Sequence, residues 1–138
     1  SARRGGGVSD LQRLLEDEAF RLFAQSHEVL RPLAAQFSLI KDRDRAITGS
    51  GFITSFLFDD DALPIDFRDE YLFAGVMTGE CEEMPLFFLD FQLEDGFLSR
   101  IDGNANGGLW KLASSPRLTV HDIPPYEYLA PYITQGRA

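Results

Sequence analysis

The hydrophobic pattern near the start of the chain has the period of a helix. Apolar residues recur there at spacings of three and four, which predicts an amphipathic helix with one apolar stripe. The residues of this stripe are Leu11, Leu14, Leu15, Ala19, Leu22 and Phe23. Ser9 with Gln12 three positions later resembles a capping box, so we expect the helix to begin at Ser9. Glu16, Asp17 and Arg21 are expected on the opposite, polar face.

The helical pattern is expected to stop near Pro32, because proline removes a backbone donor and clashes with the preceding turn. Residues 33–41 fit either a short helical turn or a first strand. After the charged run from Asp42 to Arg45 the period changes from 3.6 to 2. Alternation along residues 52–58 predicts a strand whose even-numbered positions share one face, with Gly49 and Gly51 marking a bulge or close backbone packing.

Further strands are predicted at residues 71–78, 86–93, 97–101 and 118–121. The sequence Asp95-Gly96 between two aromatic runs indicates a tight hairpin, because both residues tolerate positive φ. Phe87, Leu89, Phe91 and Phe97 are expected to be internal. A helix followed by strands with short connections predicts an α+β fold, in which an N-terminal amphipathic helix packs on a mainly antiparallel sheet of about four to six strands.

The domain organisation follows from length and composition. A chain of 138 residues with 44% hydrophobic and 25% charged residues fits one globular domain. We expect a disordered N-terminus over 1–8, a single α+β domain over 9–122, and a Pro/Tyr-rich C-terminal tail over 123–138 that packs on the domain. The lone Cys81 excludes a disulfide scaffold, and no apolar segment follows Arg3-Arg4, so a cytoplasmic location is expected.

Negative charge is concentrated in the later part of the chain. The formal net charge is −9, and residues 51–138 hold 15 acidic and 5 basic side chains. Nucleic acids and anionic membranes need a positive surface, and no stretch is long and apolar enough for a membrane span, so neither is expected as a partner. A basic protein partner fits this charge, because opposite fields steer encounter. A plainer interpretation is that the acidity serves solubility.

The candidate partner-binding residues come from the acidic stretch between the first two predicted long strands, together with the single tryptophan. They are Asp59, Asp60, Asp61, Asp66, Asp69, Glu70 and Trp110. Three adjacent carboxylates can converge only in a loop, where they present charge to a partner or hold a cation. A solvated loop that protects a sheet edge is the simpler alternative.

Candidate metal and catalytic chemistry is weakly represented. Residues 102–107 match the first half of an EF-hand loop, but position twelve is Ala113, so a left-handed turn is expected there and no metal site. His27, His121 and Cys81 supply the residue types of a nucleophilic pair, but nothing in the spacing brings them together. We therefore expect no catalytic residues and no cofactor.

Two segments carry a resemblance to known proteins. Ile47 to Phe56 resembles a TG-x-GF-x-T-x-F strand, and Leu86 to Trp110 resembles a strand, an Asp-Gly hairpin, a second strand and a glycine-containing turn that closes on tryptophan. The combination is similar to a group of small bacterial α+β proteins, some of which are immunity proteins of toxin–immunity systems. Residues 102–106 depart from it, since an aromatic turn is expected there. The resemblance implies a stoichiometric inhibitor that binds a cognate toxin.

Two classes of function therefore remain open. The first is a non-catalytic binding protein, an immunity-type inhibitor whose acidic surface covers a basic toxin. The alternative is a small hydrolase or small-ligand-binding domain with a pocket between helix and sheet. A pocket lined by His27 or His121 with carboxylates would favour the alternative.

Overall fold

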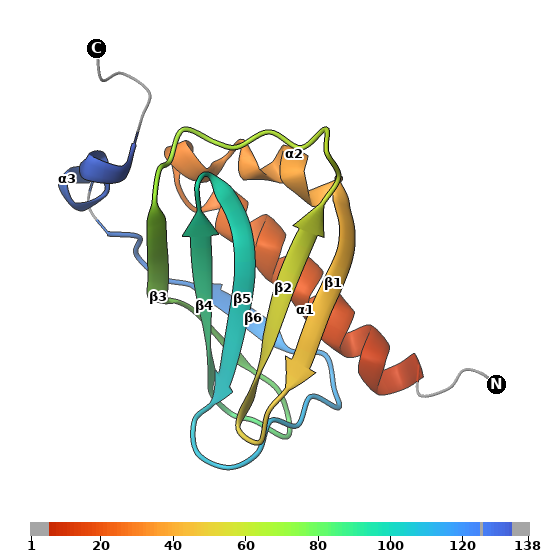
Figure 1. The fold of residues 1–138 in the computed structure, drawn as a ribbon. Helices are drawn as coiled ribbons and strands as arrows, with labels where there is room; N and C mark the ends of the chain where they lie inside the picture. Colours follow the sequence, from red (N-terminus) through yellow and green to blue (C-terminus); the bar gives the residue numbers. More distant parts are fainter. Residues whose placement is uncertain (1–5, 125, 134–138) are drawn as a thin grey trace.

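The structure is a computed structural model that describes residues 6–124 and 126–133. Six antiparallel strands form one sheet, and the long helix α1 packs on one of its faces (Figure 1). The predicted α+β fold is therefore confirmed. The elements are α1 (Gly6–Gln25), η1 (Glu28–Leu30), α2 (Leu33–Phe37), β1 (Ile40–Ile47), β2 (Gly51–Phe58), β3 (Glu70–Glu80), β4 (Phe87–Glu94), β5 (Phe97–Ala105), β6 (Arg117–Val120), α3 (Tyr126–Leu129) and η2 (Ala130–Tyr132).

The order of strands in the sheet is β1-β2-β5-β4-β3-β6, so β1 and β6 are the edges. Strand β3 changes register between Phe73 and Met77, where Gly75 has a positive φ of 75°. Strand β6 pairs only with the second half of β3, beyond this irregularity. In Figure 1, α1 crosses behind β1 and β2, and no described helix covers the opposite face of the sheet.

The core lies between α1 and the inner face of the sheet. Phe23 on α1 stacks on Phe91 of β4 with ring centroids 4.3 Å apart and meets the edge of Phe73 on β3. Burial of such rings supplies much of the stabilisation, since each buried Phe contributes roughly 1.5–3 kcal/mol. In β2 the even-numbered Phe52, Thr54 and Phe56 are buried, which confirms the predicted inner face.

The hairpin between β4 and β5 also has the predicted form. Asp95 and Gly96 have φ of 50° and 87°, as a type I′ turn requires. Phe97, however, is only half-buried, so the prediction that it is internal was wrong. The ladder shifts register between Gln92 and Leu93, and Leu98 takes the core position beside Leu93.

Helix α1 differs from its prediction at both ends and in its orientation. It begins at Gly6, so Ser9 lies inside the helix and not at its start. It ends at Gln25, well before Pro32. The helix is also rotated about its axis relative to the predicted stripe, because Leu14 is 61% exposed and Glu16 is fully buried.

Two other sequence interpretations need correction. Residues 33–41 contain both of the elements considered for them, the short helix α2 and the start of strand β1. The charged run from Asp42 to Arg45 lies within β1 and does not precede the first strand. Strand β5 continues to Ala105, so Asp102, Gly103 and Asn104 are strand residues and do not form a left-handed turn. The positive φ values lie further on, at Gly107 and Gly108.

The described part of the C-terminal segment packs on the domain. Leu129 is fully buried, and Ile133 forms an isolated bridge with Phe67. The ring of Tyr132 stacks on that of Phe67 at 5.8 Å. The remainder of the predicted tail, residues 134–138, and most of the predicted disordered N-terminus, residues 1–5, lie outside the described residues.

Candidate functional site

The predicted acidic residues lie together at one end of the sheet. Residues 59–69 connect β2 to β3 and run along the top edge of the view in Figure 1. All six acidic candidates in and next to this connection are exposed, namely Asp59, Asp60, Asp61, Asp66, Asp69 and Glu70. The backbone folds the first three into a turn, in which the amide of Asp61 donates to a carboxylate oxygen of Asp59 at 3.0 Å.

Two further carboxylates join this group through the β4–β5 hairpin. The amide of Asp95 donates to the carbonyl of Asp69 at 2.9 Å, and Glu94 lies opposite Glu70 in the β3–β4 ladder. We call these eight exposed residues, the six above with Glu94 and Asp95, the acidic end. Sequence reasoning missed the last two because it assigned the Asp-Gly sequence to turn formation alone. The only basic residue between 59 and 70 is Arg68, whose Nε donates to the carbonyl of Pro131.

A buried glutamine holds the connection in place. The side-chain amide of Gln36, which is 1% exposed, donates to the carbonyls of Leu63 and Gly96 at 2.9 and 2.8 Å. Its oxygen accepts from the amide of Leu98, and the amide of Ile65 donates to the carbonyl of Gly96. These bonds tie α2, the 59–69 connection and the hairpin together, so the carboxylates stand on a fixed backbone.

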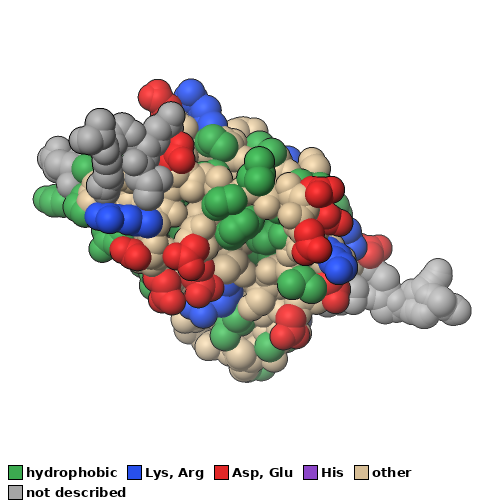
Figure 2. Space-filling model, turned by 45° about the horizontal axis from the view of Figure 1, so that its top comes forward, with side chains coloured by type: hydrophobic (Ala, Val, Ile, Leu, Met, Phe, Trp, Pro, Cys, Tyr) green, Lys and Arg blue, Asp and Glu red, His purple; other side chains and the backbone are tan. Residues whose placement is uncertain are grey.

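The connection from β2 to β3 that carries most of the acidic end also has an exposed apolar residue. Leu63 is 77% exposed, whereas its neighbours Ala62 and Ile65 are buried. Figure 2 shows acidic side chains in separate groups on this side of the molecule, with hydrophobic side chains between them. An apolar centre with a charged rim is the usual layout of a protein–protein interface.

Trp110, the seventh candidate, lies elsewhere and is buried. Its ring contacts Phe52 and Phe87, with centroids 4.9 and 5.1 Å away. Its indole N–H donates to Oε1 of Gln12 at 3.0 Å. Only 9% of Trp110 is exposed, so its main role is to join the segment after β5 to α1.

A polar network that the sequence analysis missed connects α1 to β1 and β2. Glu16 is fully buried, and its two oxygens accept from Nε and Nη2 of Arg45 at 2.6 and 2.7 Å and from Nη1 of Arg43 at 3.0 Å. The Thr54 hydroxyl and the Gln12 amide also donate to Glu16. Arg43 bonds in addition to Asp17.

The pKa of Glu16 reflects two opposing effects. Burial by itself raises the pKa, because a carboxylate is poorly solvated in the core. The hydrogen bonds from Arg45, Gln12 and Thr54 outweigh burial and leave the pKa below its usual value of 4.5. Arg45 shows the matching change, since its hydrogen bonds to Glu16 raise its pKa. Glu16 is therefore an ionised structural group.

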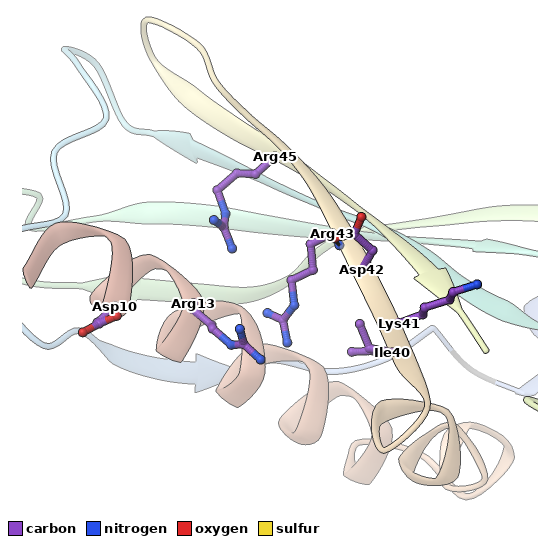
Figure 3. Close-up of a pocket in the computed structure, with 7 residues that line it drawn as sticks. All are labelled: Asp10, Arg13, Ile40, Lys41, Asp42, Arg43 and Arg45. Atoms are coloured by element: carbon purple, nitrogen blue, oxygen red, sulfur yellow. Dashed lines mark hydrogen bonds between the residues drawn. The ribbon is translucent and has the colours of Figure 1, made fainter. Parts of the chain in front are cut away.

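Two hollows lie beside this network, one on each side of Arg45. The first, of about 380 Å³, lies between α1 and β1 and is lined by Arg13, Lys41, Arg43 and Arg45, among others. Figure 3 shows the side chains of Arg13, Arg43 and Arg45 reaching into the space between helix and strand. The second, of about 330 Å³, lies between Arg45 and Trp110.

The other candidate chemical groups have structural partners. Nδ1 of His27 accepts from the amide of Val29 and caps η1, and Nε2 of His121 is 2.8 Å from the hydroxyl of Thr78. Neither histidine lines either of these two hollows. Within residues 6–124 and 126–133, no group of three or more His, Cys, Asp or Glu side chains is placed to hold a metal ion.

Comparison with known proteins adds no relative. No family model, no curated protein and no solved structure matches the chain. None of the helices in the described part of the chain has the length and apolar character needed to cross a membrane.

Proposed function

We propose that this chain is a non-catalytic binding protein, an immunity-type inhibitor that covers a basic bacterial toxin domain in the cytoplasm. The single observation that supports this most directly is the acidic end, where the β2–β3 connection and the β4–β5 hairpin together carry eight exposed carboxylates. Gln36 holds these two segments together through hydrogen bonds to their backbone, so little conformational entropy is lost when a partner binds.

The charge of the acidic end suits a partner that itself binds anions. A nuclease needs a cationic groove for its substrate, and carboxylates placed in that groove would exclude the phosphates. Exposed carboxylates at the rim of an interface mainly accelerate encounter, whereas buried contacts set the rate of dissociation. We assign the first role to the acidic side chains and the second to Leu63.

The test of the charge uses the rate of association. The partner is first identified by co-purification and by co-expression with the products of adjacent reading frames. Stopped-flow association rates are then measured against salt for the wild type and for Asp59→Asn/Asp60→Asn/Asp61→Asn. We expect the triple variant to associate about tenfold more slowly at low salt, and the difference to shrink as the screening length falls towards about 8 Å at physiological ionic strength.

A matched control separates the acidic end from net charge. Glu18→Gln/Glu82→Gln/Asp122→Asn removes the same three charges from exposed positions outside the acidic end. We expect its association rate to stay near that of the wild type. Equal rates for all three proteins, independent of salt, would show that the acidic end is only a solvated surface.

The apolar part of the proposal has its own test. Leu63→Ser removes an exposed side chain, so folding should be unaffected. If Leu63 is an anchor at the centre of the interface, dissociation should become about tenfold faster with little change in association. An unchanged dissociation rate would exclude Leu63 from the interface.

A further inference from the structure

The hollow between Arg45 and Trp110 has an apolar floor. Trp110 and Leu112 are 9% and 3% exposed. Gln12 also lines the hollow, and both polar atoms of its amide already have a partner, since Oε1 accepts from Trp110 and Nε2 donates to Glu16. The floor itself presents an indole ring and an aliphatic side chain.

The charged residues that line this hollow are both cations. They are Arg45 and Lys111, although the chain as a whole has a net charge of −9. Glu16 neutralises much of the charge of Arg45 but leaves its Nη1 without an acceptor among the described residues. Lys111 is exposed and forms no ion pair with any described side chain, so it supplies the unpaired positive charge.

The remaining wall is formed by Ile47 on β1 and by Ala113. Ile47 is 56% exposed although it is aliphatic and lies at the end of an edge strand. Arg45 is held by two hydrogen bonds to Glu16, so its guanidinium does not need to be ordered when a ligand arrives. The volume of about 330 Å³ is within the range of small-molecule sites.

We propose that this hollow binds a small amphipathic carboxylate, with its apolar body on Trp110 and Leu112 and its carboxylate between Lys111 and Arg45. An apolar floor with cations at one side matches a ligand that is apolar at one end and anionic at the other. The site lies towards the Gly51 end of β2, because Arg45 and Ile47 pair with Thr54 and Phe52, and the acidic end follows Phe58 at the other end of that strand. About four to six residue steps of strand, roughly 14–20 Å, separate them, so the two sites can be tested independently.

The test uses 3-phenylpropanoate as the probe and the full chain as the protein. Trp110 is the single tryptophan, so its fluorescence and its indole N–H chemical shift report on this site alone. We expect a saturable change with the acid and binding at least about tenfold weaker for the neutral analogue 3-phenylpropan-1-ol. Absence of saturable binding at millimolar probe, or equal binding of acid and alcohol, would overturn the proposal.

Two variants locate the probe. Lys111→Gln removes the unpaired charge from an exposed side chain and should weaken acid binding about tenfold while leaving alcohol binding unchanged. Ala113→Phe should fill the hollow and weaken both ligands. The matched control is Lys41→Gln, which removes a cation from the other hollow. A second control, Asp59→Asn/Asp60→Asn/Asp61→Asn, removes charge from the acidic end. Neither control should alter binding of the acid. An unchanged affinity in Lys111→Gln would contradict the site even if Ala113→Phe failed to fold.

Discussion

The ring of Phe52 occupies the space beside Gly103, its partner across the β2–β5 ladder. A Cβ atom at Gly103 would lie 2.0 Å from a ring carbon of Phe52, closer than side chains approach in proteins. Phe52 in turn packs against Trp110, which forms the floor of the second hollow. The phenyl ring can lie beneath that floor because glycine at position 103 has no side chain.

The first prediction follows from this contact. Gly103→Ala should lower the free energy of unfolding by about 1–3 kcal/mol, because the core must shift to admit a methyl group. Gly49→Ala is the matched control, since a methyl group at Gly49 would enter open space, with nothing within 4 Å, and Gly49 does not have a positive φ. Urea denaturation measures both, and equal midpoints would show that Phe52 moves aside at little cost.

The second prediction compares two phenylalanines on opposite faces of β4. Phe91 is fully buried and stacked on Phe23, so Phe91→Ala should cost about 3–5 kcal/mol. Phe88 lies on the opposite face and is 37% exposed, so Phe88→Ala should cost about 1 kcal/mol or less. Thermal and urea unfolding of both variants test this. A cost below about 1 kcal/mol at Phe91 would mean that the hairpin register is wrong.

These contrasts show why most of the sheet could be predicted from the sequence. In β4 alternate residues are apolar and buried, and in β2 the buried residues alternate with more exposed ones, because only one face of each strand packs on the core. Period two and the Asp95-Gly96 turn therefore indicate both the face and the pairing. The same rule failed for β1, where basic and acidic residues alternate and there is no alternation of apolar with polar residues. Arg43 and Arg45 point inward because they form ion pairs there with the buried Glu16. A search for apolar positions cannot detect charged residues that face inward.

The burial of Glu16 does have a signal in the sequence. Its spacing to Ala19, Phe20 and Phe23 is three, four and seven, so it lies on the buried stripe of α1. A carboxylate on such a stripe needs a cationic partner, and that partner comes from a strand 27 to 29 residues later. The six acidic residues of the acidic end between positions 59 and 70 were predictable because their charges are local in sequence, whereas Glu94 and Asp95 join them only through the β4–β5 hairpin. The second hollow was not predictable, since its walls come from three distant segments.

The third prediction concerns calcium and the residues that match half of an EF-hand loop. Asp102 and Asn104 lie on β5, where a strand cannot wrap its ligands around an ion, and Asp102 is paired with Arg100 at 2.9 Å. Millimolar calcium should therefore leave the melting temperature unchanged, whereas any ligand of the folded state would raise it. A rise that disappears in Asp102→Ala would contradict this prediction.

The last prediction is the pH dependence contributed by Glu16. Because its pKa is lowered in the folded protein, the unfolded chain binds more protons below pH 4.5. The contribution of Glu16 is thus fully present above that pH and is lost as the pH falls towards the lowered value. Glu16→Gln leaves Arg45 without a carboxylate partner and Arg43 with Asp17 alone, and should cost about 3 kcal/mol at neutral pH.

The difference between wild type and Glu16→Gln should shrink as the pH falls below 4.5, since a protonated Glu16 resembles glutamine in charge. Urea denaturation at a series of pH values measures this difference directly. Glu18→Gln, on an exposed position of the same helix, should change stability by less than about 0.5 kcal/mol at every pH. A Glu16→Gln difference that stays constant down to low pH would mean that the pKa of Glu16 is the same in the folded and the unfolded chain, and a difference that grows as the pH falls would mean that the carboxyl is protonated in the folded protein.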